Sequence, residues 1–346
     1  MSGASGVADT PADAPDAPDD EFEPGKASRE RRPVDYLAMG ASLYTPATRA
    51  DLRALFVGER YPRLRSVVAC TEDAIDASAV KRALSNLRES LSDLGASGPL
   101  RFVRPRNPQV LADLIADLIA DGSIAALDGI CLPKLDQANI GGYLDVLTSA
   151  PRLAIMPIIE TEIAFSVDAL HALRQRLDKV RDRIVCIRIG GNDLLQLMGM
   201  RRPRDMTAYD TPLRRVIDNM IIAFRPAGLD LSAPVYEHIA CAETLAREVA
   251  LDVEHGLLAK TAIHPAQIPL IEAAYAVPPE DAAMAQAILD PDAAAVFRFN
   301  GAMAEPATHR RWAARTLERE AVYGLRAESP IIACNCHAKP GEGSGY

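Results

Sequence analysis

The 346-residue chain has no long apolar run and few cysteines. Because no stretch of about 18 consecutive apolar residues occurs, the sequence predicts no membrane span. Its six cysteines are too sparse for the disulfide framework of a small secreted protein. Four of them lie singly in apolar segments, where a free thiol behaves as a small buried hydrophobic side chain: Cys70, Cys131, Cys186 and Cys241. We therefore expect a soluble protein of the reducing cytoplasm.

The N-terminal residues are not expected to form a targeting segment, and the chain has no excess of positive charge. Its N-terminus carries Asp9, Asp13 and Asp16, where a signal peptide would have a basic region followed by an apolar core. There are 38 Lys and Arg residues against 47 Asp and Glu residues, so the net charge is -9. This acidic balance argues against general nucleic-acid binding, although it leaves room for a local basic patch. We expect neither a nucleic-acid partner nor a membrane partner.

Several motifs of nucleotide-binding, hydrolytic and redox sites are missing. The sequence has no P-loop, no G-x-S-x-G and no C-x-x-C pair, and no G-x-G-x-x-G follows its first apolar run. Near the C-terminus, Cys334, Cys336 and His337 are metal-like in type. They provide only three candidate ligands in a Gly-rich tail, so a mobile chain end is the favoured interpretation.

The composition that is present is that of a globular protein with two polar ends. Hydrophobic residues make up 49% of the chain and charged residues 25%, near the globular average. Residues 1–33, rich in Ala, Pro, Asp, Gly and Ser, are predicted to be a disordered leader. Residues 34–276 are predicted to form the main domain, 277–327 a C-terminal helical extension, and 328–346 a flexible tail.

Within the main domain, eight short apolar runs alternate with longer segments of helical period. The runs begin at Met39, Ser66, Arg101, Asp128, Leu153, Ile184, Ala233 and Leu257. The helical segments are predicted at 48–56, 79–94, 108–120, 140–147, 163–177, 211–224, 241–254 and 266–276. Continuous Val, Ile and Leu runs joined by helices are typical of a parallel sheet buried on both faces. The sequence therefore predicts an α/β fold, a (β/α)8 TIM barrel. A doubly wound sheet is the alternative, but its dinucleotide-binding form would carry G-x-G-x-x-G.

Two carboxylates follow neighbouring apolar runs. Glu160 comes directly after the fifth run, and Asn192 and Asp193 follow the sixth. A barrel places its reactive groups at the carboxyl ends of its strands, so these two acids would meet there. Mg²⁺ is often held by one or two carboxylates together with water. In the alternative interpretation, each carboxylate caps the helix that follows it.

An arginine ends the third run. Pro105 cannot donate a hydrogen bond within a sheet, so the strand is expected to stop near Arg104 and leave that guanidinium at the mouth of the barrel. A guanidinium can bind a carboxylate, a phosphate or an enolate oxygen. A surface salt bridge is the alternative. Arg106, two residues later, would lie on the same face of the extended segment as Arg104 and is a second candidate.

Three other basic or titratable features have open interpretations. His264 follows the eighth run and is more often a structural hydrogen-bond partner than a base or a ligand. Lys260 is compatible with an interior lysine paired to a carboxylate, so we assign no Schiff base to it. The basic loop of Arg201, Arg202 and Arg204 is compatible with a phosphate site, a solvated face or a subunit contact.

Seven motifs along the chain resemble those of the citrate lyase beta subunit and HpcH/HpaI aldolase superfamily. The resemblance spans about residues 39 to 276, and the motifs occur in the family's order at the expected strand ends. They are ASLYTP at Ala41, TEDAI at Thr71, VRPRNP at Val103, LPKLDQ at Leu132, PIIET at Pro157, IGGNDL at Ile189 and AKTAIHPAQI at Ala259. The chain resembles a divergent branch, similar to the lyase-like barrels found with stress and tellurite-resistance gene clusters.

The resemblance implies a carbon–carbon lyase that depends on Mg²⁺ or Mn²⁺. Such an enzyme cleaves or forms the bond of a 3-hydroxy acid, or of its coenzyme A thioester, by an aldol or Claisen-type step. The implied partners are a small hydroxy or oxo acid or an acyl-CoA, and other copies of the chain in a homo-oligomer such as a trimer. A different hypothesis is a noncatalytic ligand-binding or scaffold barrel in a biosynthetic or stress-resistance complex.

The resemblance also implies roles for individual residues. Glu160 and Asp193 would hold the metal, and Arg104 would stabilise negative charge on the enolate or substrate oxygen. Glu72 and Asp73 match the family's acidic motif and would orient the arginine or a metal-bound water. The implied substrate-binding residues are Arg106, Pro133, Lys134, Gly190, Gly191 and Asn192.

The chain departs from the family pattern at three strand ends. Its second strand ends in CTED from Cys70, where the family commonly has Asp-Leu-Glu-Asp, so the first carboxylate is lost. Where the family's seventh strand commonly ends with an acidic residue, this chain has SAP from Ser232. Arg106 stands where the family often has Asn, and Asn107 is shifted by one position. Specificity for citryl, malyl or citramalyl thioesters is therefore not carried over to this chain.

Overall fold

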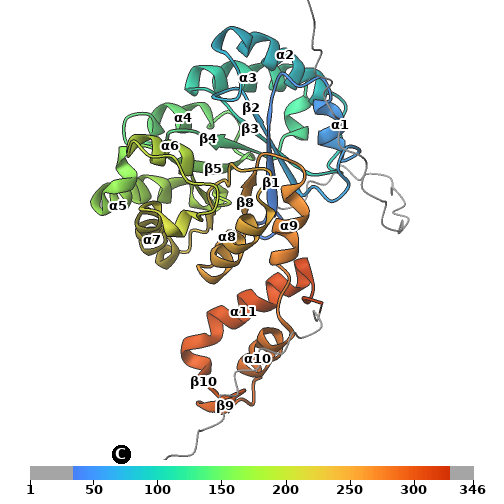
Figure 1. Cartoon of the computed structure of the whole chain (residues 1–346). Coiled ribbons are helices and arrows are strands. Elements are labelled where there is room, and N and C mark those ends of the chain that lie inside the picture. Colours follow the sequence, from blue (N-terminus) through green and yellow to red (C-terminus); the bar gives the residue numbers. More distant parts are fainter. Residues whose placement is uncertain (1–33, 328–346) are drawn as a thin grey trace, which may run out of the picture.

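Eight parallel strands form a barrel surrounded by helices (Figure 1). The structure is a computed structural model, and it describes residues 34–327. The strand order is β7-β6-β5-β4-β3-β2-β1-β8. A parallel bridge between Ala233 and Lys260 joins the end of β7 to β8 and closes the ring. The predicted (β/α)8 TIM barrel is confirmed. The predicted leader (1–33) and tail (328–346), with Cys334, Cys336 and His337, lie outside the described residues.

The strands that form the barrel are short and buried. They are β1 (Ala41–Pro46), β2 (Ser66–Cys70), β3 (Leu100–Arg104), β4 (Gly129–Leu132), β5 (Ala154–Ile159), β6 (Ile187–Ile189), β7 (Leu231–Ser232) and β8 (Lys260–Ala262). Every residue of β2 and β5 is buried. Strands covered on both faces bury side chains in both directions, and this explains their continuous apolar runs.

The helices follow the strands in alternation. They are α1 (Leu52–Val57), α2 (Val80–Leu91), α3 (Pro108–Ala120), α4 (Ile140–Val146), α5 (Val167–Leu177), α6 (Gly191–Leu197), α7 (Leu213–Phe224), α8 (Ala242–Glu254) and α9 (Gln267–Ala274). Helix α3 has the predicted bounds because its start is encoded locally. The Asn107 side chain caps it by accepting a hydrogen bond from Val110 N at 2.9 Å, and Pro108 occupies its first turn.

The seventh strand differs from its prediction. It was expected from Ala233 onward, but the structure has only Leu231–Ser232 as β7. The Ala233 N–H still donates to Ala259 O at 2.7 Å, whereas Pro234 has no N–H to donate and cannot extend the pairing. The paired segment therefore begins and ends earlier than the apolar run suggests.

A helical extension follows the barrel and projects from it beyond α9 (Figure 1). It consists of α10 (Pro279–Leu289), the hairpin of β9 (Phe297–Phe299) and β10 (Ala302–Ala304), and α11 (Pro306–Tyr323). Its own small hydrophobic cluster contains Ala285, Ile288, Ala304 and Ala313. Its two ends are joined because Val277 N donates to Gly324 O at 3.0 Å. The predicted helical extension is therefore present.

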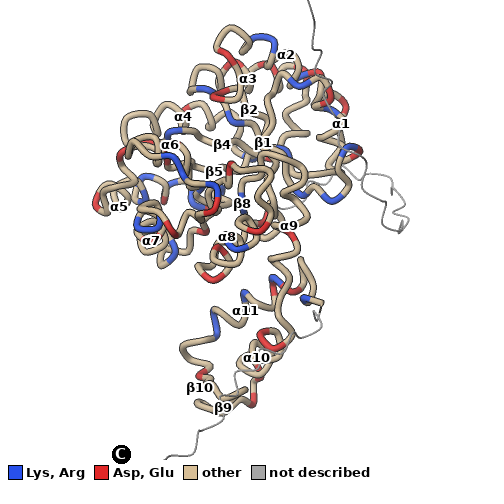
Figure 2. The backbone as a smooth tube through the Cα atoms, viewed as in Figure 1, with Lys and Arg blue, Asp and Glu red and all other residues tan. Residues whose placement is uncertain are grey.

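Charged residues of both signs are interspersed over the barrel helices and the extension (Figure 2). Among residues 34–327, no helix combines the length and the apolar character that a membrane crossing would require.

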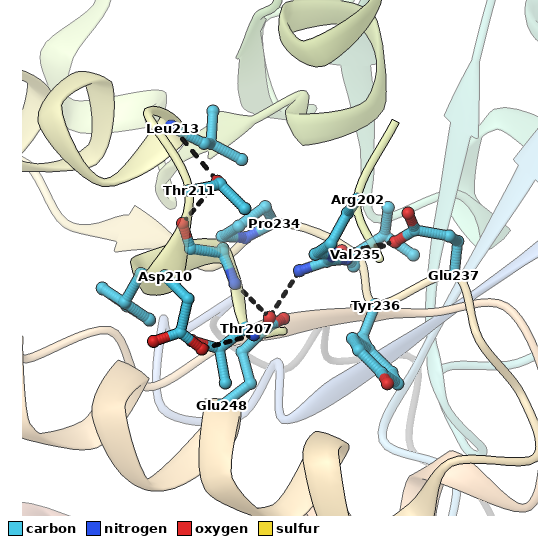
Figure 3. Close-up of polar contacts among 12 residues, drawn as sticks. Arg202, Thr207, Asp210, Thr211, Leu213, Pro234, Val235, Tyr236, Glu237 and Glu248 are labelled. Carbon is cyan, nitrogen blue, oxygen red and sulfur yellow. Dashed lines mark hydrogen bonds and ion pairs between the residues drawn. The ribbon is translucent and has the colours of Figure 1, made fainter. Parts of the chain in front are cut away.

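A buried ion-pair network fixes the region where the barrel closes. Lys260 Nζ, on β8, donates to Glu248 Oε1 and Asp252 Oδ2 of α8, both at 2.8 Å. On its other side, Glu248 is paired with Arg202, which also contacts Glu237 (Figure 3). Lys260, Glu248 and Asp252 are fully buried. Lys260 is thus an interior lysine paired to carboxylates. Arg202 of the basic loop has a structural role in the same network.

Candidate active site

A cavity of about 490 Å³ lies at the carboxyl ends of the barrel strands. It is lined from β2 and β3 by Cys70 and Arg104, and from the ends of β5 and β6 by Glu160, Asn192 and Asp193. This is the end of a TIM barrel at which active sites occur. A larger cavity of about 940 Å³ lies between α7, α8 and α11, and none of the predicted site residues lines it. The first cavity is therefore the candidate site.

Glu160 and Asp193 reach this cavity from neighbouring strands. Glu160 follows β5 directly and is 4% exposed, and its Oε1 accepts a hydrogen bond from Lys134 N at 2.9 Å. Asp193 lies in the first turn of α6. Neither carboxylate caps a helix, because Gly190 is the N-cap of α6 and Thr161 precedes the short helical turn after β5. The capping interpretation therefore does not apply to these acids.

Gly190 allows the end of β6 to approach the Glu160 carboxylate. A Cβ atom at position 190 would overlap Glu160 Cβ and Oε2. Gly191 is similarly confined, since a Cβ there would lie 2.8 Å from Pro234 Cβ. Glycine is required where two backbones or a backbone and a side chain come this close.

The two carboxylates share one electrostatic environment. Burial raises the pKa of Glu160 to about 7, with Arg104 opposing this shift and the negative charge of Asp193 adding to it. Burial also raises the pKa of Asp193, and Asp73 adds to that shift. A buried acid and a partly buried acid that disfavour each other's charge are both stabilised by a nearby cation.

The chemistry of this donor set fits a hard divalent cation. No group of three or more His, Cys, Asp or Glu side chains suited to a metal occurs within residues 34–327. Mg²⁺ does not need such a group, because it commonly binds one or two carboxylates and keeps water or substrate oxygens as its other ligands. Glu160 and Asp193 can supply those two carboxylates.

Arg104, the last residue of β3, is held in a buried ion pair. Its Nη2 lies 3.1 Å from Glu72 Oε2, and its Nε donates to Cys70 Sγ at 3.2 Å. The guanidinium carbon lies 5.5 Å from the centre of the Tyr44 ring. Its side chain is 13% exposed, so the contact is not the surface salt bridge that the sequence left open. Arg104 lines the cavity in a fixed orientation.

Lys134 holds both acids of the second-strand motif. Its Nζ contacts Glu72 Oε1 and lies 2.9 Å from Asp73 Oδ2. Burial lowers the pKa of Lys134, but its contacts with Glu72 and Asp73 outweigh that effect and raise it. The backbone of Lys134 has φ of 47°, an uncommon value for a residue with a side chain. This conformation accompanies the hydrogen bond from its N–H to Glu160.

The other predicted substrate-binding residues divide into two groups. Gly190, Gly191 and Asn192 line the cavity. Arg106, Pro133 and Lys134 do not line it. Lys134 contacts the site through the carboxylates of Glu72, Asp73 and Glu160. Arg106 instead donates to the carbonyls of Glu72 at 2.9 Å and Ile75 at 2.7 Å, which fixes the loop after β2.

The remaining basic candidates lie outside the cavity. His264 is exposed and accepts a hydrogen bond from Ala266 N at 3.2 Å, so it has the structural role that the sequence favoured. Arg204 donates to Cys241 Sγ at 3.2 Å, and Arg201 is exposed. Arg202 is buried against Glu248, so its guanidinium is not available to a phosphate.

Among the lining residues that were not predicted from the sequence are Tyr44 of β1, Arg188 of β6 and Thr261 of β8. Tyr44 and Thr261 carry no signal that distinguishes them from ordinary strand residues. Arg188 does, because it is a charged residue in the middle of the apolar run IVCIRIG.

An eight-stranded barrel with acids and arginines gathered at its carboxyl end defines a TIM-barrel protein with an enzyme-like site. The chain belongs to the family of C–C bond lyases of the TIM-barrel fold, which matches residues 33–325. The predicted membership of a carbon–carbon lyase family of the TIM-barrel fold is therefore confirmed. None of the curated proteins compared with it matches.

Solved structures share the fold at low identity. The CitE protein of Mycobacterium tuberculosis in complex with magnesium, acetoacetate and coenzyme A is 22% identical, with a TM-score of 0.60 over 83% of this chain and 99% of that one. The citrate lyase beta subunit of M. tuberculosis, complexed with oxaloacetate and magnesium, is 22% identical, with a TM-score of 0.51 over 69% and 98%. RipC from Yersinia pestis is 19% identical, with a TM-score of 0.52 over 69% and 96%.

Proposed function

We propose that this chain uses Mg²⁺, or Mn²⁺ in its place, to cleave or form a carbon–carbon bond of a 3-hydroxy acid by an aldol or Claisen-type step. The observation that carries the proposal is the meeting of Glu160, Asp193 and Arg104 in one cavity at the carboxyl ends of the strands. The magnesium in the related CitE structure supports the choice of metal.

Glu160 and Asp193 would hold the metal. When bound there, the metal would supply Lewis-acid polarisation of a substrate carbonyl. The hydrogen bond from Lys134 N fixes Glu160 before any ligand arrives. The carboxylate side chain therefore loses little conformational entropy when it binds the metal.

Arg104 would stabilise the negative charge that develops on the enolate oxygen. Its contacts with Glu72, Cys70 and the Tyr44 ring fix the guanidinium in advance, so no reorganisation is needed as the charge forms. Glu72 and Asp73, which the resemblance makes catalytic, would act as positioning residues. Lys134 pairs with both, and Glu72 in turn orients Arg104.

The size of the cavity favours a small acid. At about 490 Å³ it lies in the range of small-molecule sites, roughly 300–1,000 Å³. A substrate presented as a coenzyme A thioester would place its acyl end here and its carrier outside. The coenzyme A in the related CitE complex supports this second form of the substrate. A homo-oligomer, such as a trimer, stays a prediction that light scattering can test.

Calorimetric titration with Mg²⁺ tests the metal site. We expect saturable binding to the unmodified protein and its loss in both Glu160→Gln and Asp193→Asn, because each change removes one of two anionic ligands. Glu162→Gln is the matched control, since Glu162 is exposed and does not line the cavity. Binding that survives both cavity substitutions, or no binding to the unmodified protein, would contradict the proposal.

A noncatalytic ligand-binding or scaffold barrel is the second candidate function. It is favoured by the loss of the first acid of the second-strand motif and by the engagement of Glu72 and Asp73 with Lys134. Cleavage of any 3-hydroxyacyl thioester or free 3-hydroxy acid, abolished by Arg104→Ala, would eliminate it. Intact Mg²⁺ binding without turnover of any such substrate would support it.

A further inference from the structure

Arg188 is a buried arginine that reaches the candidate site from the middle of β6. Its exposed fraction is only 2%, yet it lines the same cavity as Arg104, Glu160 and Asp193. A guanidinium stays charged at any physiological pH. A charge removed from water needs an opposite charge or strong hydrogen-bond acceptors.

The groups around Arg188 are all neutral. Its Nη2 donates to Thr261 Oγ1 at 2.5 Å, and its Nη1 contacts Ser42 Oγ at 3.4 Å and Met156 Sδ at 3.6 Å. Its guanidinium carbon lies 5.1 Å from the centre of the Tyr44 ring. Within residues 34–327, no carboxylate forms an ion pair with it. These contacts orient the guanidinium without neutralising it.

Other buried arginines of the protein are compensated by the fold itself. Arg101 donates to the carbonyls of Phe56 at 2.9 Å and Gly95 at 2.8 Å. Arg202 is paired with two carboxylates, those of Glu237 and Glu248. Neither arginine lines the candidate site. Arg188 differs in facing the cavity and in lacking acidic and carbonyl partners.

The other positive groups around the cavity already have acidic partners. Arg104 is paired with Glu72 at 3.1 Å. Lys134 is paired with Asp73 at 2.9 Å and also contacts Glu72. These two cations and two anions balance each other.

The remaining charges are those of Glu160, Asp193 and Arg188. The two carboxylates carry the charge that a divalent metal would neutralise. Once they are assigned to the metal, Arg188 is left as a positive charge that no acid of the described residues balances. An anion entering the cavity is the group that would balance it.

We propose that Arg188 binds a carboxylate of the substrate, and that this carboxylate is distinct from the oxygens that reach Glu160 and Asp193 through the metal. This inference rests on the proposed function, since the metal end of the cavity takes the reacting part of the substrate. A carboxylate can take two parallel hydrogen bonds from a guanidinium. The substrate acid therefore carries a second anionic group, and dicarboxylic hydroxy or oxo acids are its class.

The test compares two acids that differ by one carboxylate. Malate and 2-hydroxybutyrate have the same four-carbon chain, but malate ends in a carboxylate where the other ends in a methyl group. Binding of each is measured calorimetrically with Mg²⁺ present, for the unmodified protein and for Arg188→Met. We expect the unmodified protein to prefer malate by about 10- to 100-fold, the range for a hydrogen-bonded charge, and Arg188→Met to lose most of that preference.

Arg183→Met is the matched control. Arg183 precedes the same strand, but its side chain donates to the carbonyls of Leu147, Ala150 and Leu153, away from the cavity. It should retain the preference for malate. An unmodified protein without the preference, or Arg188→Met with the full preference, would overturn the inference. Equal weakening of both acids by Arg188→Met would also overturn it.

A metal-free arm separates this inference from the proposed function. Butyrate and butyramide have nearly the same shape and differ in the negative charge of the carboxylate, and neither needs the metal to reach Arg188. If Mg²⁺ does not bind, the proposed function fails, while tighter binding of butyrate that depends on Arg188 still supports the anion subsite. If Mg²⁺ binds normally and neither pair of ligands shows a preference, only the subsite fails.

A milder variant guards against misfolding of Arg188→Met. Thr261→Val keeps the shape of the side chain and removes the hydroxyl to which Arg188 donates. It is expected to reduce the preference for malate about three- to tenfold while Mg²⁺ binding is retained, an effect of the size of one neutral hydrogen bond. An unchanged preference in this variant and in a folded Arg188→Lys would contradict the proposal.

Discussion

At the scale of single residues, the candidate site depends on the close approach of backbone segments to the Glu160 carboxylate. The Glu160 carboxylate is confined between the backbone of Lys134, which donates to it, and Gly190, which leaves it room. The positive φ of Lys134 is a local strain that the rest of the structure must maintain. Strained residues of this kind often occur next to functional groups.

Replacement of Gly190 by alanine should weaken Mg²⁺ binding. The added Cβ would overlap Glu160 Cβ and Oε2 and displace the carboxylate, so we expect the dissociation constant to rise about tenfold or more, equivalent to about 1.4 kcal/mol. Calorimetry measures this change. Gly141→Ala is the control, because its Cβ would meet no atom closer than 3.8 Å. Equal affinities in the two variants would show that Glu160 is not held as described.

At the scale of elements, the strand ends are joined by charges as well as by the sheet. Strand β7 has only two residues, and Pro234 ends its pairing. The network of Lys260, Glu248 and Asp252 compensates by fastening β8 to α8. Burial raises the pKa of Asp252 to about 6, and Lys260 opposes this shift. The carboxylate therefore depends on Lys260 to remain charged at neutral pH.

Lys260→Met should destabilise the protein strongly at neutral pH. Removal of one partner leaves buried carboxylates without compensation, which typically costs about 3–5 kcal/mol. Because folding then favours the protonated acids, the loss should shrink as the pH falls below the raised pKa of Asp252. Urea unfolding at several pH values measures both effects. Arg247→Met, which removes an exposed ion pair with Asp210, should cost no more than about 1 kcal/mol. Similar costs in both variants would contradict this account of the network.

The elements differ in how far the sequence predicted them. Helix α3 was predicted to the residue because Asn107 and Pro108 are local start signals. The seventh strand was misplaced because its end depends on a partner distant in sequence, Lys260. Among the candidate site residues, Glu160 and Asp193 were expected at strand ends because they follow apolar runs, and both line the cavity. Arg106 was misplaced because strand parity does not reveal which carbonyls a long side chain will reach.

At the scale of the whole molecule, the barrel and the extension have separate hydrophobic clusters. The barrel cluster spans residues from Tyr36 to Tyr275, whereas the extension has a small cluster of four buried residues, including Ile288 and Ala313, with five partly buried side chains packed against them. Segments with few buried apolar contacts open at lower free energy than the rest of a protein. The extension is therefore expected to be the less stable unit.

Ile288→Ala should open the extension and spare the barrel. The loss of a buried side chain costs about 2–5 kcal/mol in a core, which is large for a cluster of four residues. Hydrogen exchange should show lost protection in α10 and α11, with unchanged exchange in the barrel helices and unchanged Mg²⁺ affinity. Leu173→Ala, in the barrel cluster, is the comparison and should destabilise the barrel helices. Equal loss of protection throughout the Ile288→Ala protein would show that the two units unfold together.

The sequence by itself determined the barrel and the strand ends at which the candidate site residues lie. Both follow from local information: apolar runs with helical segments between them, and polar residues directly after each run. Only the tertiary structure decided which groups contact each charged side chain. Lys134 engages Glu72 and Asp73, Arg202 belongs to the fold, and Arg188 faces the cavity without an acid. The physical reason is that a charge inside a protein is defined by what neutralises it, and in a barrel those groups come from strands far apart in the chain.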